Sequence, residues 1–143
     1  MTLLRADVTL DILNERGRNF FPGHMGIEVQ ALAAGRVYAR MPVQAHLLAP
    51  NGFLHAASVI ALADTACGYG TIAHLPEGAQ SFTTIELKSN FIGTVTEGTL
   101  VCEARGEHLG RTTQVWDATV GDEASGRKIA LFRCTQIILW PKA

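Results

Sequence analysis

The chain has 143 residues, of which 48% are hydrophobic and 17% are charged. This composition is typical of a soluble globular protein with one domain and a sizeable core. Lys and Arg number 12 against 13 Asp and Glu, so no overall charge attracts the chain to nucleic acid or to an anionic membrane. The N-terminal stretch MTLLRADVTLDILNERG carries charges where a signal peptide needs its apolar core, and we therefore expect a cytoplasmic protein.

The first third of the chain predicts a short helix and a β-hairpin. In TLDILNERG the apolar residues recur at helical spacing, and Gly17 ends the segment. FFPGH then interrupts the chain with proline and glycine. MGIEVQALAAGRVYARMPV has the pattern of two short strands that turn at Ala34 and Gly35, and QAHLLAPNG is predicted to be a loop.

A long helix is predicted from His55 to about Ala73, where Ala, Leu and Ile dominate and only glycines interrupt the pattern. The apolar run from Ala56 to Leu75 is long enough to raise the question of a membrane span. It is rich in Ala, Gly and Thr, and Asp64 near its centre is costly in hydrocarbon. A buried helix of a soluble protein is therefore the favoured interpretation.

Four strand-like segments follow the loop LPEGAQ, with turns at Gly98, at Gly110 and in GDEASG. They are SFTTIELKSNF, TLVCEARGEHL, TTQVWDATV and KIALFRCTQIILW. No connection is long enough for a second crossover helix, so we expect hairpins to join the strands into one antiparallel sheet. An α+β fold follows, with the antiparallel sheet curled round one long central helix in a single domain, residues 1–143.

The three cysteines, Cys67, Cys102 and Cys134, lie far apart in apolar runs, without a CxxC motif or a histidine cluster. This pattern is typical of small core residues in a reducing compartment and gives no sign of a metal site. The alternative is a nucleophilic Cys67 assisted by His74, two turns further along the predicted helix.

Asp64 is the residue that an apolar helix does not explain. Its neighbours at three, four and seven residues are alanine, isoleucine, cysteine, glycine and threonine, and none of them can neutralise a carboxylate. A buried carboxylate without a partner shifts its pKa, which is the property that a catalytic base or nucleophile uses. The alternative is a structural carboxylate bonded to a loop N–H or to an arginine from a strand.

His55 stands nine residues before Asp64, so 2.5 turns of helix place the two side chains on opposite faces, about 13 Å apart along the axis. If both serve one site, two helices lie side by side in a symmetric dimer, with His55 of one chain facing Asp64 of the other. Alone, His55 would be a helix cap or a loop histidine. The first N–H groups of the helix, from Ala56 and Ala57, lack intrahelical acceptors and can bind a developing oxyanion.

NGFLHAASVIALADTACGYGT, followed by TTIELKSNFIGTV, resembles the hotdog-fold acyl-CoA thioesterases, in particular the PaaI-like group related to 4-hydroxybenzoyl-CoA thioesterase. The resemblance covers roughly Gly26 to Leu139. It implies hydrolysis of an acyl-CoA thioester by a homodimer that forms the active site, with dimers commonly paired into tetramers. Coenzyme A is then part of the substrate and no cofactor is needed; its phosphates require cations, for which Arg111 and Lys88 are candidates.

The resemblance also implies roles for single residues. The Ala56 N–H, at the start of the helix, would bind the thioester carbonyl oxygen. Asp64 from the other subunit would attack the carbonyl carbon or activate water, and His55 would orient the site or assist the leaving group. A hydroxyl on the following strand would help to place the water; Thr84 is the candidate, with Thr83 as the alternative because only one of two adjacent strand residues faces the helix.

Two departures from the family pattern affect the expected site. The family has two glycines after the histidine, where this chain has Ala56 and Ala57; the backbone donor is kept, but the methyl groups narrow the approach of the thioester. The family usually has Asn or Gln six residues before the histidine, where this chain has Ala49. Asn51, four residues before it, either takes that role or forms the turn that its PNG context favours.

Two other functions remain open. A hotdog-fold dehydratase or hydratase would also take acyl thioesters, but its acid and base act on C–H and hydroxyl groups rather than on the carbonyl. The nine-residue spacing from His55 to Asp64 favours hydrolysis. A catalytically silent acyl-CoA binding protein is the second alternative, suggested by the alanines and the missing amide. The sequence does not indicate which acyl group is bound.

Overall fold

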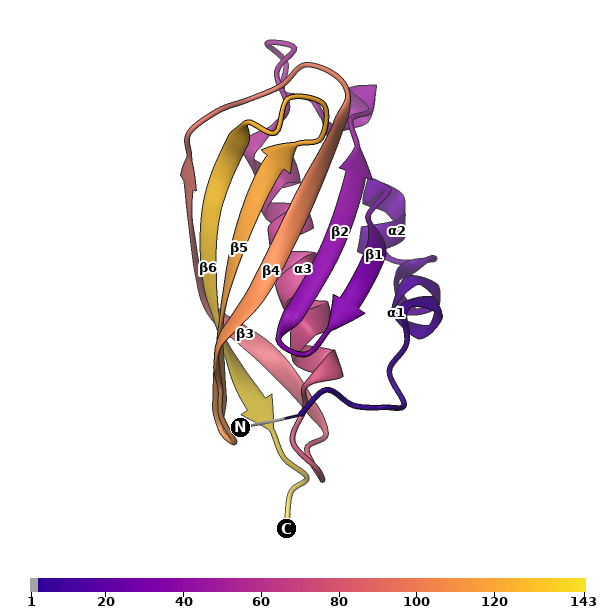
Figure 1. Cartoon of the computed structure of the whole chain (residues 1–143), viewed down its shortest axis with the longest axis vertical. Coiled ribbons are helices and arrows are strands. Elements are labelled where there is room, and N and C mark those ends of the chain that lie inside the picture. The colour runs from indigo at the N-terminus through magenta and orange to yellow at the C-terminus, as the bar shows by residue number, and fades with distance from the viewer. Residues whose placement is uncertain (1–2) are drawn as a thin grey trace.

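The computed structural model of the chain describes residues 3–143. Its elements in chain order are α1 (Leu10–Gly17), α2 (Phe21–Met25), β1 (Glu28–Ala33), β2 (Arg36–Pro42), the 3-10 helix η1 (Ala45–Leu47), α3 (Ala56–Ala73), β3 (Ser81–Phe91), β4 (Thr99–Leu109), β5 (Thr113–Asp122) and β6 (Lys128–Leu139). The strands form one curved sheet whose concave face holds α3, while α1 and α2 lie beside β1 and β2 (Figure 1). The expected sheet curled round a central helix is therefore present.

The sheet has six strands in the order β1-β2-β4-β5-β6-β3, and all neighbouring strands are antiparallel. The expectation that hairpins join all four C-terminal strands is wrong for the first of them. β3 pairs with β6 at one edge of the sheet, because β2 and β5 already occupy both sides of β4. Residues 92–98 cross between the two strands and are held by backbone bonds from Leu54 to Val95 (2.9 Å) and from Val43 to Gly98 (2.8 Å).

The predicted long helix is confirmed almost residue for residue as α3, with His55 as its N-cap. Two thirds of its residues are buried, so although α3 is long and apolar enough to cross a membrane, the sheet wraps it. Small residues allow this close wrapping. A Cβ on Gly70 would lie 2.6 Å from a ring carbon of Trp116, which is shorter than any normal contact.

The segment FFPGH is not a simple break, as the sequence suggested, because its last four residues belong to the five-residue helix α2, which ends at Met25. Pro22 lies in the first turn, where a missing N–H costs no helical hydrogen bond, and Gly26 with φ of 76° ends the helix. Asn14 ties α1 to β1, because its side-chain amide both donates to Val29 O (3.0 Å) and accepts from Val29 N–H (2.8 Å).

His74, the C-cap of α3, fastens the β1–β2 turn to the end of the central helix. Its Nδ1 lies 2.8 Å from Gly70 O, and its Nε2 accepts the N–H of Gly35 at 2.9 Å. The ring is therefore neutral, with its proton on Nδ1. Burial lowers the pKa of His74. Since both ring nitrogens are engaged by the backbone, the alternative of a histidine that activates Cys67 finds no support.

The interpretation of the cysteines as core residues is confirmed. Cys67, Cys102 and Cys134 are all buried and unpaired by disulfides. Burial raises the pKa of Cys67 and raises that of Cys102 to about 12, which disfavours the nucleophilic thiolate.

Candidate active site

His55 caps the start of α3 with its own ring. Its Nδ1 accepts the backbone N–H of Ala57 at 2.9 Å, and its backbone N–H donates to Leu47 O at 3.1 Å. Because Nδ1 is an acceptor, the neutral ring carries its proton on Nε2, which faces away from the capping bond. The residue is exposed. In the protomer His55 is therefore the helix cap that the sequence offered as one interpretation. Its Nε2 proton stays available to a ligand.

The N–H of Ala56 is the free donor at this helix start. Ser58 and Val59 donate to the carbonyl of His55, and Ala57 donates to its ring. Within residues 3–143 the Ala56 N–H has no such acceptor. It lies at the positive end of an 18-residue helix and on the surface, so it can bind a carbonyl oxygen as negative charge develops there.

Asn51 belongs to the tight turn that precedes α3. Its side-chain Oδ1 accepts the N–H of Phe53 at 3.1 Å, and Ala49 and Phe53 close the turn through a backbone bond of 2.7 Å. Gly52 supplies the left-handed backbone of the turn, with φ of 88°. The geometry is that of the turn that the PNG context favours.

Asp64 lies in the middle of α3, where its Oδ1 is buried and has no hydrogen-bond partner within residues 3–143. Burial raises the pKa of this carboxyl, because the charged form loses solvation that nothing in the protomer replaces. The alternative of a structural carboxylate bonded to a loop N–H or an arginine is not seen for this oxygen. A raised pKa and an oxygen without a partner are the properties that the sequence analysis expects of a catalytic base or nucleophile at this position.

Within one protomer, His55 and Asp64 cannot act on the same atom. α3 is continuous from Ala56 to Ala73, so the two residues are separated by about 13 Å along its axis and by half a turn around it. The structure therefore keeps the separation that the sequence implied.

Thr84, and not Thr83, faces the central helix. Thr84 pairs across strands with Gln136, which is completely buried, whereas Thr83 pairs with the exposed Ile137. The Thr84 hydroxyl donates to Gln136 Oε1 at 2.7 Å. A β-bulge follows at Ile85, which shifts the register of the rest of β3.

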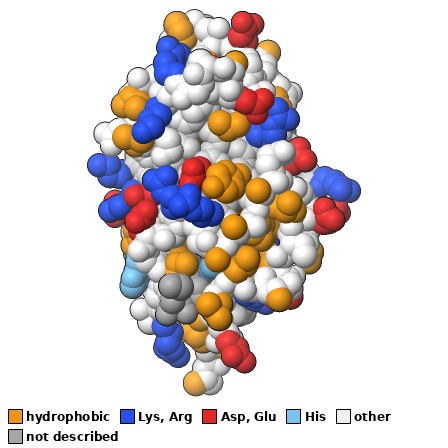
Figure 2. Space-filling view, viewed as in Figure 1, with side chains coloured by type: hydrophobic (Ala, Val, Ile, Leu, Met, Phe, Trp, Pro, Cys, Tyr) orange, Lys and Arg blue, Asp and Glu red, His pale blue; other side chains and the backbone are white. Residues whose placement is uncertain are grey.

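Lys88 and Arg111 lie at different places in the protomer. Lys88 pairs with Arg133 on the outer face of the sheet, where Figure 2 shows basic and acidic side chains intermingled at mid-height. The Arg111 guanidinium lies 4.3 Å above the ring of Trp140, which packs against the loop that follows α3. Neither cation adjoins His55 in the protomer, and their role as phosphate ligands stays a prediction.

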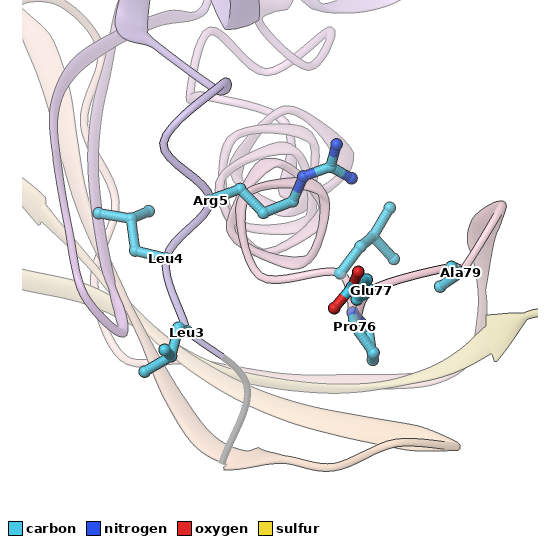
Figure 3. Close-up of a pocket in the computed structure, with 8 residues that line it drawn as sticks. Leu3, Leu4, Arg5, Pro76, Glu77 and Ala79 are labelled. Carbon is cyan, nitrogen blue, oxygen red and sulfur yellow. The ribbon is translucent and has the colours of Figure 1, made fainter.

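Two cavities flank the N-terminal segment at the C-terminal end of α3. One has a volume of about 650 Å³ and lies between residues 3–5 and 75–79, as Figure 3 shows. The other, of about 640 Å³, is lined by His74 and the turns around Gly35 and Gly110. Asp64 and His55 line neither cavity, so this end of the molecule is separate from the predicted site. Within residues 3–143 no three His, Cys, Asp or Glu side chains gather as metal ligands.

Gln136 is the residue near the predicted site that the sequence analysis missed. The signal was present in the alternation of β6, in which Phe132, Cys134, Gln136 and Ile138 all face inward and only Gln136 is strongly polar. A polar side chain at an inward-facing position requires a partner, and here that partner is Thr84.

Known proteins resemble the chain over nearly its whole length. A family model, the thioesterase superfamily, matches residues 51–129. The proofreading thioesterase EntH of Klebsiella pneumoniae is 34% identical over 94% of this chain and 97% of its own. The 1,4-dihydroxy-2-naphthoyl-CoA hydrolase of Escherichia coli is 30% identical over 94% and 98%. A crystal structure of a variant of thioesterase PA1618 from Pseudomonas aeruginosa, 27% identical, aligns with a TM-score of 0.90 over 96% of this chain and 99% of that one.

These likenesses, added to a curled sheet round a helix that carries a lone carboxylate, define a thioester hydrolase with the hotdog fold. The chain belongs to the thioesterase superfamily. The fold and the reaction class that the resemblance implied are both confirmed.

Proposed function

We propose that this protein hydrolyses an acyl-CoA thioester to a carboxylic acid and free coenzyme A, at a site formed between two copies of the chain. The observation that carries the proposal is the buried, unpaired carboxylate oxygen of Asp64 on a helix whose start offers the free N–H of Ala56. Two relatives support the substrate class: one is named a proofreading thioesterase and the other a CoA-thioester hydrolase.

The edge strand β3 supports the pairing of two copies. β3 has 11 residues and, among residues 3–143, pairs only with β6, so its outer backbone groups find no partner strand in the described part of the chain. Large apolar side chains along and just after it are exposed; they are Ile85, Leu87, Phe91 and Ile92, at 55%, 40%, 45% and 57% of their surface. A long apolar edge is a template for a second strand. Two β3 strands paired about a twofold axis would bring the two α3 helices side by side.

In the proposed dimer, each site takes His55 and the Ala56 N–H from one chain and Asp64 from the other. The Ala56 N–H donates a hydrogen bond to the carbonyl oxygen and stabilises the oxyanion of the tetrahedral intermediate. In the base route, Asp64 removes a proton from water, the water oxygen bonds to the carbonyl carbon, and the C–S bond breaks. The thiolate of coenzyme A leaves with a hydrogen bond from the Nε2–H of His55 and takes up the proton that Asp64 removed from water, which restores the carboxylate.

In the nucleophile route, Asp64 itself bonds to the carbonyl carbon and the thiolate leaves, giving an anhydride that water then hydrolyses. Both routes need the ionised carboxylate, and both yield the same products. Trapping distinguishes them, since hydroxylamine added during turnover intercepts an anhydride and would leave a hydroxamate on Asp64 or on the acyl group.

The first experiment compares wild type with Asp64→Asn on phenylacetyl-, benzoyl-, hexanoyl- and decanoyl-CoA, with release of free thiol as the readout. We expect wild-type turnover of at least one substrate and a loss of about 10³-fold or more in the variant, because both routes lose their reacting group. Asp117→Asn, which removes a surface carboxylate bonded to Arg133, is the control and should keep full activity.

Near-normal turnover by Asp64→Asn would contradict the mechanism. Turnover of an enoyl thioester without thiol release would instead indicate a hydratase. Thermal stabilisation by acyl-CoA without turnover of any substrate would indicate a silent binding protein.

A further inference from the structure

We propose that Gln136 is a positioning residue for hydrolysis: it holds the hydroxyl of Thr84 so that the Thr84 oxygen acts only as an acceptor for the attacking water. The inference rests on the proposed function and adds to it a residue with no direct contact to substrate. Its basis is the bond from Thr84 Oγ1 to Gln136 Oε1, at 2.7 Å, between an inward-facing strand residue and a completely buried amide.

The direction of this hydrogen bond decides what Thr84 can do. A threonine hydroxyl has one proton to donate and two lone pairs that accept. Here the proton goes to Gln136 Oε1. The amide cannot turn round without cost, because its Nε2 donates to Cys134 Sγ at 3.5 Å on the other side. Thr84 Oγ1 is therefore left with lone pairs only, so it can accept a hydrogen bond from water but cannot donate one to a carboxylate.

A continuous set of contacts links this amide to the neighbourhood of Asp64. Cys134, to which Gln136 donates, lies against Cys67 one helical turn beyond Asp64. Burial, the bond with Cys134 and, more weakly, the charge of Asp64 all act on the Cys67 thiol. The central helix packs against both β3 and β6, and the proposal places Asp64 and Thr84 on either side of the attacking water in this region.

The consequence for catalysis is geometric. A water held there gives one proton to Asp64 and directs the other at Thr84 Oγ1, which turns a lone pair of the water oxygen toward the carbonyl carbon. If the Thr84 hydroxyl rotated freely, it would spend part of its time donating to Asp64, which would weaken the carboxylate as a base. Gln136 prevents this competition.

The chain contains a matched control in Gln114. Gln114 pairs directly with Gln136 across β5 and β6 and is equally buried. Its amide, however, donates to His74 O at 2.8 Å and accepts from Trp116 Nε1 at 2.9 Å. Gln114 therefore serves the C-terminal end of α3. Replacing either glutamine removes a buried amide, but only Gln136 bonds to Thr84.

The experiment is a double-variant cycle in kcat and KM, with Gln136→Met, Thr84→Val, both together, Thr84→Ser and Gln114→Met. Methionine keeps the unbranched shape of glutamine and removes both of its bonds. We expect Gln136→Met to lower kcat about 10- to 100-fold with little change in KM. The double variant should be no slower than Thr84→Val, since both substitutions remove the same water contact. Thr84→Ser keeps the hydroxyl and should lose less kcat than Thr84→Val, whereas Gln114→Met should retain wild-type kcat.

Three results would overturn the proposal while the proposed function stands: unchanged kcat in Gln136→Met, losses that multiply in the double variant, or an equal loss in Gln114→Met. Should Gln136→Met not fold, Gln136→Leu takes its place in the same cycle. Failure of the proposed function looks different, because wild type and every variant would then release no thiol from any acyl-CoA.

Discussion

The ionised side chain of Asp64 lowers the stability of the folded protein, and its proposed catalytic role requires this ionised form. Burial raises its pKa and no group within residues 3–143 bonds its Oδ1. A carboxyl whose pKa is higher in the folded state favours folding below its unfolded pKa, and this contribution is lost as pH rises through the folded value. At neutral pH the ionised carboxylate of Asp64 therefore destabilises the folded state.

We predict that Asp64→Asn is more stable than wild type at pH 7.5, by about 1 kcal/mol, or roughly 3 °C in Tm. Thermal unfolding at equal protein concentration measures it. The gain should shrink as pH falls through the raised pKa of Asp64 and the wild-type carboxyl takes up a proton. The control Asp117→Asn loses a bonded carboxylate instead and should not gain. If folded Asp64→Asn has a Tm equal to or lower than that of wild type at pH 7.5, the ionised Asp64 carboxylate does not destabilise the folded protein.

The same shift predicts the pH dependence of activity. Only the ionised form of Asp64 acts as base or nucleophile, so kcat/KM should fall on the acid side as this carboxyl takes up a proton. Because burial raises its pKa, the fall should begin at a higher pH than for an ordinary aspartate. A profile of kcat/KM from pH 4 to 9 tests this, and activity that stays flat down to pH 4 would argue against Asp64 as the reacting group.

At the scale of elements, His74 joins the β1–β2 turn to α3 through a ring that must stay neutral. Protonation of Nε2 would remove the acceptor for the Gly35 N–H. The pKa of His74 is lowered by burial, so its contribution to stability is complete above the unfolded pKa, near 6.5, and declines as pH falls below that value.

We predict that His74→Gln is less sensitive to acid than wild type. Glutamine offers one acceptor and one donor in place of the two ring nitrogens, and it does not titrate in this range. Between pH 6.5 and 5.5 wild type should lose up to about 1 kcal/mol more than the variant in chemical unfolding. Parallel pH slopes for the two proteins would show that another group controls acid stability.

The helices and strands were largely predictable from the sequence, but the order in which the strands pair in the sheet was not. The bounds of α3 follow from a run rich in Ala, Leu and Ile that only glycines interrupt, and the turn at Ala34 and Gly35 follows from its residue types. The place of β3 beside β6 depends on pairing between strands nearly 50 residues apart, for which no local pattern exists. The helix α2 was not predicted, because proline and glycine occur at helix ends as well as in loops.

The candidate site also has a part that was predictable from the sequence and a part that was not. Asp64, His55 and the Ala56 N–H lie on one helix, so their spacing was available from the sequence. The choice between Thr83 and Thr84 required the register of β3 against β6, and the bulge at Ile85 makes that register irregular.

At the scale of the whole molecule, a shared site makes a prediction about mixtures. Asp64→Asn lacks the carboxylate, and His55→Asn lacks the imidazole while keeping a side chain that caps a helix. In a mixed dimer, one site combines both defects and the other receives intact His55 and intact Asp64. Co-folding equal amounts of the two inactive variants should therefore restore about a quarter of wild-type activity.

The control for this mixture is each variant refolded alone, which should remain inactive. Recovery that depends on co-folding distinguishes a shared site from residual activity. If the mixture is no more active than its parts, while native mass spectrometry shows that mixed dimers have formed, His55 and Asp64 do not act across the interface.

The edge position of β3 also sets an order of events during synthesis. β3 is made before β4, β5 and β6, yet its only neighbour in the sheet is β6, near the C-terminus. The apolar residues of β3 therefore have no partner strand to pair with until almost the whole chain has been translated. The surface proposed to bind a second copy is completed last, so a nascent chain cannot present it in finished form before the rest of its own sheet is in place.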